Sequence, residues 1–167
     1  MSEADEAAFR AFAHTRRAGL RRTAYLMCGD WHQADDLVQS ALTKLYVAWR
    51  RVRSDEAPDA YVRRILTRCF LDERRRPWRR ESPVDVLEDH AAAPRSVESA
   101  LDLRSALALL PARQRATVVL RFWADASVTE TAEALGCSEG TVKSQTARAI
   151  NTLRSLLADP VLAEEMS

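Results

Sequence analysis

Residues 127–156, SVTETAEALGCSEGTVKSQTARAINTLRSL, are the most informative stretch of this chain. They predict two helices joined by a tight turn at Gly136-Cys137-Ser138, because the Ser138 side chain can cap the free N–H groups of the helix that follows it. Apolar residues at helical spacing give each helix one buried side. This pattern is typical of a helix-turn-helix, in which the second helix enters the major groove of DNA.

The second helix, predicted over 138–152, has a polar face without large apolar side chains. That face carries two cations and no acidic residue after Glu139. Its side chains suit base edges and phosphates in a major groove. A helical hairpin inside a core is the alternative, but the polar face favours DNA. The residues that we expect at DNA are Thr141, Lys143, Ser144, Gln145 and Arg148.

Composition narrows the class of protein. The 167 residues are 47% hydrophobic, with a net charge of +1, so a packed core is expected and any nucleic-acid affinity must come from locally clustered charge. Cys28, Cys69 and Cys137 have no ligand spacing with one another or with the histidines, so we expect no metal, no cofactor and no thiol catalyst. No signal peptide or membrane-length apolar run is visible, and we expect a cytoplasmic protein without a membrane partner.

Helical periodicity divides the chain into two parts. Helices are predicted over 6–28, 31–51 and 59–76, and helical spacing returns from about residue 97. The intervening stretch contains two prolines and four acidic residues, which is typical of a linker. We therefore expect an all-α fold of two small helical domains on a flexible tether. The expected bounds are 1–80 for the first domain, 81–96 for the acidic linker and 97–160 for the second domain.

A basic patch covers the third predicted helix and the residues after it. Residues 50–80 contain eleven arginines and five acidic residues, with Trp78 among the last arginines. A guanidinium group can donate two parallel hydrogen bonds to a phosphate, and an aromatic ring can stack on an unpaired base. The alternative is a solvated basic helix end, but the density of charge favours nucleic acid. The arginines singled out are Arg63, Arg64, Arg68, Arg74, Arg75 and Arg76.

The second predicted helix has a polar side opposite its apolar stripe. Asp35 and Asp36 are adjacent there, so their side chains diverge by about 100° around the helix and lack a third ligand. Neither acid–base catalysis nor a metal site is expected from them. Solvated surface and contact with a partner both remain open for this face, which also includes Gln39, Ser40, Thr43 and Lys44.

At this point the chain resembles a known family along nearly its whole length. The stretch GDWHQADDLVQSALTKLYVAW resembles region 2 of bacterial sigma factors, and LPARQRATVVLRFWADASVTETAEALGCSEGTVKSQTARAINTLR resembles their region 4. With only these two regions and a short linker, the chain is similar to the extracytoplasmic-function (group 4) sigma factors. The motifs YLMCGDWHQADDLVQ, AYVRR and GTVKSQTAR resemble the actinobacterial SigE-like group.

The resemblance implies a non-enzymatic subunit that binds core RNA polymerase and directs promoter-specific initiation. It implies that the helix 138–152 contacts the minus-35 element, and that the loop at about 51–59 helps to capture a flipped base of the minus-10 element. Many family members have Asn in place of Arg68 and Arg in place of Gln145, so promoter sequences are not carried over. The residues implied at the opened minus-10 strand are Tyr61, Arg63, Arg64, Arg68, Arg74, Arg75 and Arg76.

The same resemblance implies the protein partners. The polar side of the second helix would dock on the clamp helices of the polymerase β′ subunit, and the second domain on the β flap. An anti-sigma factor that covers these faces is a further partner known in many relatives. The residues implied at the polymerase are Asp35, Asp36, Leu37, Gln39 and Lys44.

Two other classes of protein are alternatives to a sigma factor. A dimeric helix-turn-helix repressor or activator would bind a palindromic operator tightly without polymerase. An enzyme acting on nucleic acid would need a carboxylate cluster, a metal-ligand set or a nucleophile–base pair, and the sequence shows none of these.

Overall fold

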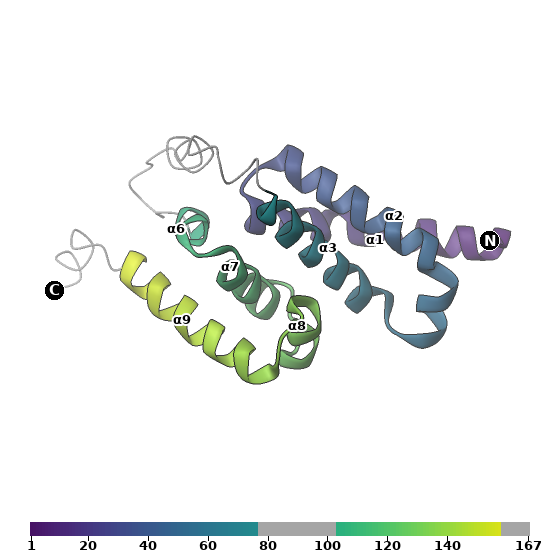
Figure 1. Cartoon of the computed structure of the whole chain (residues 1–167). Helices are drawn as coiled ribbons and strands as arrows, with labels where there is room; N and C mark the ends of the chain where they lie inside the picture. The colour runs from purple at the N-terminus through teal and green to yellow at the C-terminus, as the bar shows by residue number, and fades with distance from the viewer. Residues whose placement is uncertain (77–102, 158–167) are drawn as a thin grey trace.

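The computed structural model describes residues 1–76 and 103–157, and all regular structure in these residues is helical. The predicted all-α fold is confirmed, whereas the predicted linker 81–96 lies outside the described residues. The elements in chain order are α1 (Glu3–Cys28), α2 (Trp31–Asp55), α3 (Pro58–Arg75), α6 (Leu103–Leu109), α7 (Ala112–Val118), the π-helical turn η1 (Val119–Trp123), α8 (Val128–Leu135) and α9 (Glu139–Leu157) (Figure 1).

The connection between α1 and α2 is as tight as a helical hairpin allows. Gly29 ends α1 in the left-handed region, with φ 77°, and its N–H donates to the carbonyl of Tyr25 at 2.8 Å. Asp30 then caps α2 by accepting from the N–H of Gln33 at 2.9 Å. The two helices therefore pack side by side along their length.

The second helix is longer than the sequence predicts. Val52 is fully buried and continues the apolar stripe of α2 one turn beyond Trp49, so the helix runs to Asp55. Pro58 occupies the first turn of α3, where its missing N–H costs nothing. The expected loop at 51–59 is wrong, because only Glu56 and Ala57 separate the two helices.

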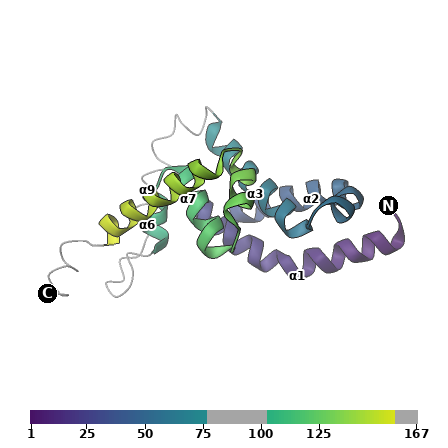
Figure 2. The same ribbon diagram turned by 90° about the horizontal axis from the view of Figure 1, so that it is seen from below.

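The two halves of the molecule pack against each other. Helix α3 lies beside α8 and α7, and α1 contacts α6 and η1 (Figures 1 and 2). The buried apolar side chains of both halves belong to one continuous cluster. The predicted fold of two small helical domains is confirmed, and the structure adds direct packing between them.

Local signals build the helix-turn-helix as the sequence predicts. A reciprocal capping box between Ser127 and Glu130 starts α8, and Gly136 ends it in the left-handed region with φ 65°. The hydroxyl of Ser138 accepts from the N–H of Thr141 at 3.1 Å, as a cap for α9 should.

The segment before α8 differs from the prediction. The apolar residues Val118, Val119, Leu120 and Phe122 predict an ordinary helix here. The structure has the π-helical turn η1 here, and it leaves Phe122 and Trp123 more than half exposed. One wider turn changes which residues face inward, and a prediction that assumes 3.6 residues per turn cannot detect this change.

Phe70 has the largest fully buried side chain among the described residues, and it offers a test of the core. We expect Phe70→Ala to lower the free energy of unfolding by about 3–5 kcal/mol, since it leaves a cavity where the α3 ring packs. Val47→Ala is the control, because Val47 is 83% exposed and should change stability by less than ~0.5 kcal/mol. Denaturant unfolding followed by circular dichroism measures both, and equal midpoints would contradict the assignment of Phe70 to the core.

Candidate nucleic-acid and polymerase interfaces

The predicted DNA-binding face of α9 is largely open to solvent. Lys143, Ser144 and Arg148 are exposed, and Thr141 is half-buried. The Ser144 hydroxyl donates to the carbonyl of Thr141 at 3.0 Å and retains acceptor capacity. These side chains project from a helix whose other side is anchored by Val142, so the face is rigidly presented.

Gln145 occupies a different environment from its neighbours on α9. Its side chain lines a cavity of about 350 Å³ together with Arg74 and Arg75 of α3 and Gln114 of α7. The Oε1 atom of Gln145 is buried there without a hydrogen-bond partner among the described residues. Gln145 is therefore half-buried, and its side chain faces residues of α3 in the first half of the molecule.

The first three arginines of α3 all contact α8. Arg63 forms an ion pair with Glu130 at 3.2 Å, and Arg68 donates to the carbonyl of Glu133 at 3.1 Å. Arg64 lies 3.9 Å from the Glu133 carboxylate. The structure thus brings these predicted strand-binding residues together on one face. Helix α8 lies against that face and leaves Arg63 and Arg64 half-buried and Arg68 exposed.

Arg64 is also held from its own half of the molecule. It donates to both carboxylate oxygens of Glu56, at 3.0 and 2.9 Å. This bidentate pair raises the pKa of the Arg64 guanidinium, so the group is a fixed positive charge. Its guanidinium also lies over the ring of Tyr61, 5.0 Å from the ring centroid.

Tyr61 is less available than the resemblance implies. The ring is 8% exposed, and Arg51 and Arg64 both approach it as cation–π partners, at 5.9 and 5.0 Å. The ring is therefore largely buried and lies beside two guanidinium groups.

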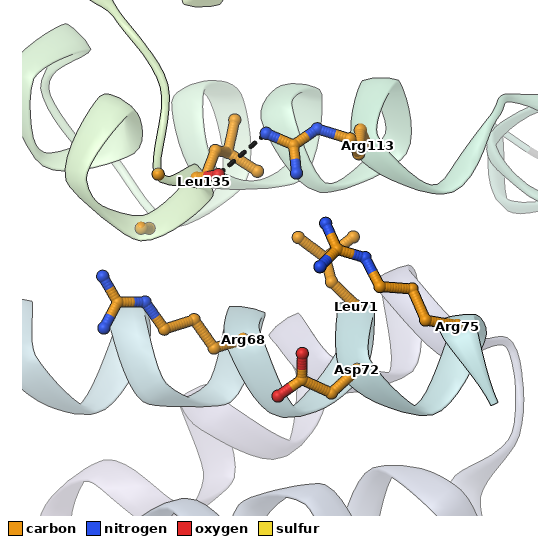
Figure 3. Close-up of a pocket in the computed structure, with 8 residues that line it drawn as sticks. Arg68, Leu71, Asp72, Arg75, Arg113 and Leu135 are labelled. Carbon is orange, nitrogen blue, oxygen red and sulfur yellow. Dashed lines mark hydrogen bonds between the residues drawn. The ribbon is translucent and has the colours of Figure 1, made fainter.

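The last arginines of α3 are arranged differently from one another. Arg74 is half-buried over the ring of Phe70, 5.6 Å from its centroid, whereas Arg75 and Arg76 are exposed. Figure 3 shows Arg75 and Arg68 on α3 facing Arg113 and Leu135 across a cavity of about 340 Å³. Arg113 is fixed there by a 2.7 Å hydrogen bond to the carbonyl of Leu135.

The polar side of α2 forms the candidate polymerase surface. Asp36, Gln39 and Lys44 are exposed on it. Asp35 is instead paired with Arg21 at 2.7 Å, and the hydrogen bond from that guanidinium lowers the pKa of the Asp35 carboxyl. Leu37 is only 1% exposed, so its side chain belongs to the core and we correct its assignment as a contact residue.

An aromatic group beside this surface was missed from the sequence. The ring of Trp31 is 40% exposed and stacks on Tyr25 with centroids 3.8 Å apart, and the Arg21 guanidinium lies over Trp31 at 4.3 Å. Trp31 is the first residue of α2. A large aromatic residue directly after the helix cap was the feature of the sequence that could have indicated this group.

Within residues 1–76 and 103–157, His, Cys, Asp and Glu side chains form no group of three that could hold a metal ion. No helix in these same ranges is both long and apolar enough to cross a membrane.

Comparison with protein families gives two matches that together include both halves. Residues 12–80 match the model described as Sigma-70 region 2, and residues 100–153 match the model described as Sigma-70, region 4. The chain is 37% identical to the RNA polymerase sigma-E factor of Streptomyces avermitilis, over 94% of this chain and 89% of that protein. It is 36% identical to the ECF RNA polymerase sigma factor SigM of Mycobacterium tuberculosis, over 92% of this chain and 79% of that protein.

Solved structures give the same result at the level of the fold. The sigma factor RpoE, in complex with the anti-sigma factor NepR from Bartonella quintana, aligns with a TM-score of 0.70 and 26% identity, covering 90% of this chain and 97% of that chain. CnrH, in complex with the cytosolic domain of CnrY, aligns with a TM-score of 0.64 and 25% identity, covering 92% and 89%.

The cysteines supply a prediction about thiol reactivity. Burial raises the pKa of the Cys28 thiol to about 11, so at pH 8 about one thiol in a thousand is the reactive thiolate. We expect iodoacetamide to modify half-buried Cys69 and Cys137 in the native protein, and Cys28 only after unfolding in guanidinium. Peptide mass spectrometry reports each site, and native modification of Cys28 at the rate of the other two would contradict its burial.

Proposed function

This chain belongs to the extracytoplasmic-function group of RNA polymerase sigma factors, and from that membership we propose how its surfaces share the task of directing promoter-specific initiation. The observation that carries the proposal is the exposed face of α9. This helix is the capped second helix of the helix-turn-helix, and its face carries two exposed cations. We assign Lys143, Ser144 and Arg148 to the minus-35 element, with Thr141 and Gln145 beside them.

The arginines of α3 are the proposed contacts for the opened minus-10 strand. Their planar donors suit phosphates, and several arginines on one helix can follow a single strand. Arg63, Arg64 and Arg68 supply one end of this surface, and Arg74, Arg75 and Arg76 the other. Tyr61 is the ring beneath Arg64 that a displaced base would reach.

The exposed polar side of α2 is the proposed docking face for core polymerase. Asp36, Gln39 and Lys44 would contact the β′ clamp helices directly, with Asp35 held in place by Arg21. The second half of the chain would contact the β flap. Such a factor works where polymerase works, in the cytoplasm, and acts by binding without catalysing a reaction of its own.

An anti-sigma factor is a further proposed partner. Both structural relatives described above were solved with another protein bound, and one of these partners, NepR, is an anti-sigma factor. A repressor or activator that acts without polymerase is not favoured, because the matches include a region 2 as well as the helix-turn-helix.

Run-off transcription tests the function itself. Fragments of the genome that encodes this chain are transcribed by purified core RNA polymerase, with and without the chain, and the transcripts are sequenced. We expect a small set of new start sites that depends on the chain and disappears with Lys143→Ala plus Arg148→Ala. Binding of the chain alone to a palindromic duplex, with no new start sites, would instead indicate the repressor.

The docking face gives a sharper prediction. Asp36→Arg should weaken binding to core polymerase by about tenfold or more, because it reverses an exposed charge at the centre of the proposed contact. Asp55→Arg is the matched control, an equally exposed carboxylate at the far end of the same helix. Surface plasmon resonance measures both. Equal affinities for the two variants would remove α2 from the interface.

The exposed end of the α3 surface, at Arg75 and Arg76, gives another prediction. Arg75→Ala with Arg76→Ala should weaken open-complex formation and make the logarithmic salt dependence shallower by about 1.4, since each single-strand phosphate contact contributes about 0.7. Arg10→Ala with Arg22→Ala removes two exposed arginines of α1 as the control. Permanganate footprints over a range of salt concentrations provide the measurement. A double variant that matches this control would exclude the two residues from strand binding.

A further inference from the structure

Two adjoining cavities lie between α3 and the second half of the molecule, and arginines dominate their walls. One has a volume of about 340 Å³ and the other of about 350 Å³, and they share Leu71, Arg75 and Arg113. Figure 3 shows the first of them, with Arg75 of α3 facing Arg113 of α7 across it. Together these two cavities, here called the arginine groove, have the size of sites that hold small molecules.

The charge of the arginine groove is almost entirely of one sign. Its walls carry four arginines and a single acidic residue, Asp72. The four arginines are Arg68, Arg74, Arg75 and Arg113. Among the residues that the structure describes, none of these four forms an ion pair with a carboxylate, whereas Arg63 and Arg64 on α3 are each paired with a glutamate. Four like charges around one space create a positive potential that attracts an anion.

The end of α8 holds two of these arginines in place without neutralising them. Arg68 donates one hydrogen bond to the carbonyl of Glu133 at 3.1 Å. Arg113 donates one to the carbonyl of Leu135 at 2.7 Å. A guanidinium has five N–H donors, so both groups keep donors for another acceptor. A phosphate suits them, because it accepts two parallel hydrogen bonds from the fork of a guanidinium.

The second cavity of the groove adds polar atoms that have no partner. Gln114 of α7 and Gln145 of α9 line it, and the Oε1 atom of each is buried without a hydrogen-bond partner among the described residues. The Nε atom of Arg74, in the same wall, is in the same condition. Unsatisfied buried polar atoms cost stability, and a ligand that pairs with them removes that cost. The last torsion of a glutamine is soft, so each amide can turn its oxygen or nitrogen into the cavity.

Apolar side chains complete the wall beside these amides. Leu71 of α3 lies there together with Pro111 and Ala112 at the start of α7. A nucleobase has flat apolar faces and an edge of hydrogen-bond donors and acceptors, so it fits a space with apolar walls and free amides. The groove therefore matches a molecule with phosphates at one end and a base at the other.

We propose that the arginine groove binds a nucleoside polyphosphate. The phosphates lie at Arg68, Arg75 and Arg113. The base lies against the apolar wall, between Gln114 and Gln145. Arg68 and Arg75 are also proposed contacts for the opened DNA strand, and one guanidinium cannot hold both ligands fully, so nucleotide and strand compete for them. The binding site itself does not depend on the proposed function, because it needs only the residues of the groove.

Direct binding tests the site with a defined probe. GTP that carries an N-methylanthraniloyl fluorophore is titrated with the full chain, and binding is followed by anisotropy. We expect saturable binding that unlabelled GTP reverses. Arg68→Gln with Arg75→Gln should weaken it by about tenfold or more, because two charged donors of phosphate hydrogen bonds are lost from exposed positions.

The matched control removes the same charge elsewhere. Arg10→Gln with Arg22→Gln changes two exposed arginines of α1 and should bind the probe like the unaltered chain. Saturating GTP should also raise the melting temperature of the unaltered chain and of this control, since the groove exists only in the folded state. Absence of saturable binding, equal losses in the two double variants, or no shift in melting temperature would each overturn the proposal.

Competing ligands identify the chemical class. GTP and ATP should displace the probe about tenfold more effectively than GMP, which has one phosphate, and about fivefold more effectively than inorganic triphosphate, which has no base. Gln114→Ala with Gln145→Ala should weaken binding of GTP about fivefold and leave binding of inorganic triphosphate unchanged.

Two results of the competition would contradict a nucleotide site. Inorganic triphosphate that displaces the probe as well as GTP does would indicate a simple anion site. A 15-nucleotide oligo-dT that displaces the probe, with no effect of the glutamine variant on GTP, would indicate a surface for a nucleic-acid strand alone. None of these measurements uses promoter DNA or polymerase, so failure of the proposed function and failure of this inference are distinguishable.

Discussion

The arrangement of this molecule depends on one positive charge buried between its halves. The guanidinium of Arg115 contacts the carbonyls of Met27, Ala108 and Leu110. Burying a cation is costly unless its donors are satisfied, and a helix C-terminus such as that of α1 offers both carbonyls and a favourable dipole. Because these partners belong to different halves, the interaction is complete only when α7 is seated on α1. That seating places α8 on α3.

Most of the local structure could be predicted because its causes are local. The Ser138 cap, the turn at Gly136 and the apolar stripes of α1, α2 and α3 all depend on residues within a few positions of one another. The errors have local causes too. Val52 extends α2 through what looks like a polar loop, and the wider turn of η1 exposes Phe122.

The candidate site was only partly predictable, for a reason of distance along the chain. Exposure of Lys143 and Arg148 follows from helical periodicity alone. The partners of the α3 arginines do not follow from periodicity. Arg63 and Glu130 are 67 residues apart, and no local sequence pattern indicates that they pair. Leu37 shows the converse: a family motif includes residues that hold a surface from beneath as well as residues on it.

Both sides of the contact between α3 and α8 belong to one polypeptide, and this has a consequence for the cell. The contact forms within one molecule, so its formation does not depend on how much of the chain is made. A partner shifts such a contact only when it binds with different affinity to the chain with the contact formed and with the contact broken. The amount of the chain and the strength of this contact are therefore separately adjustable quantities.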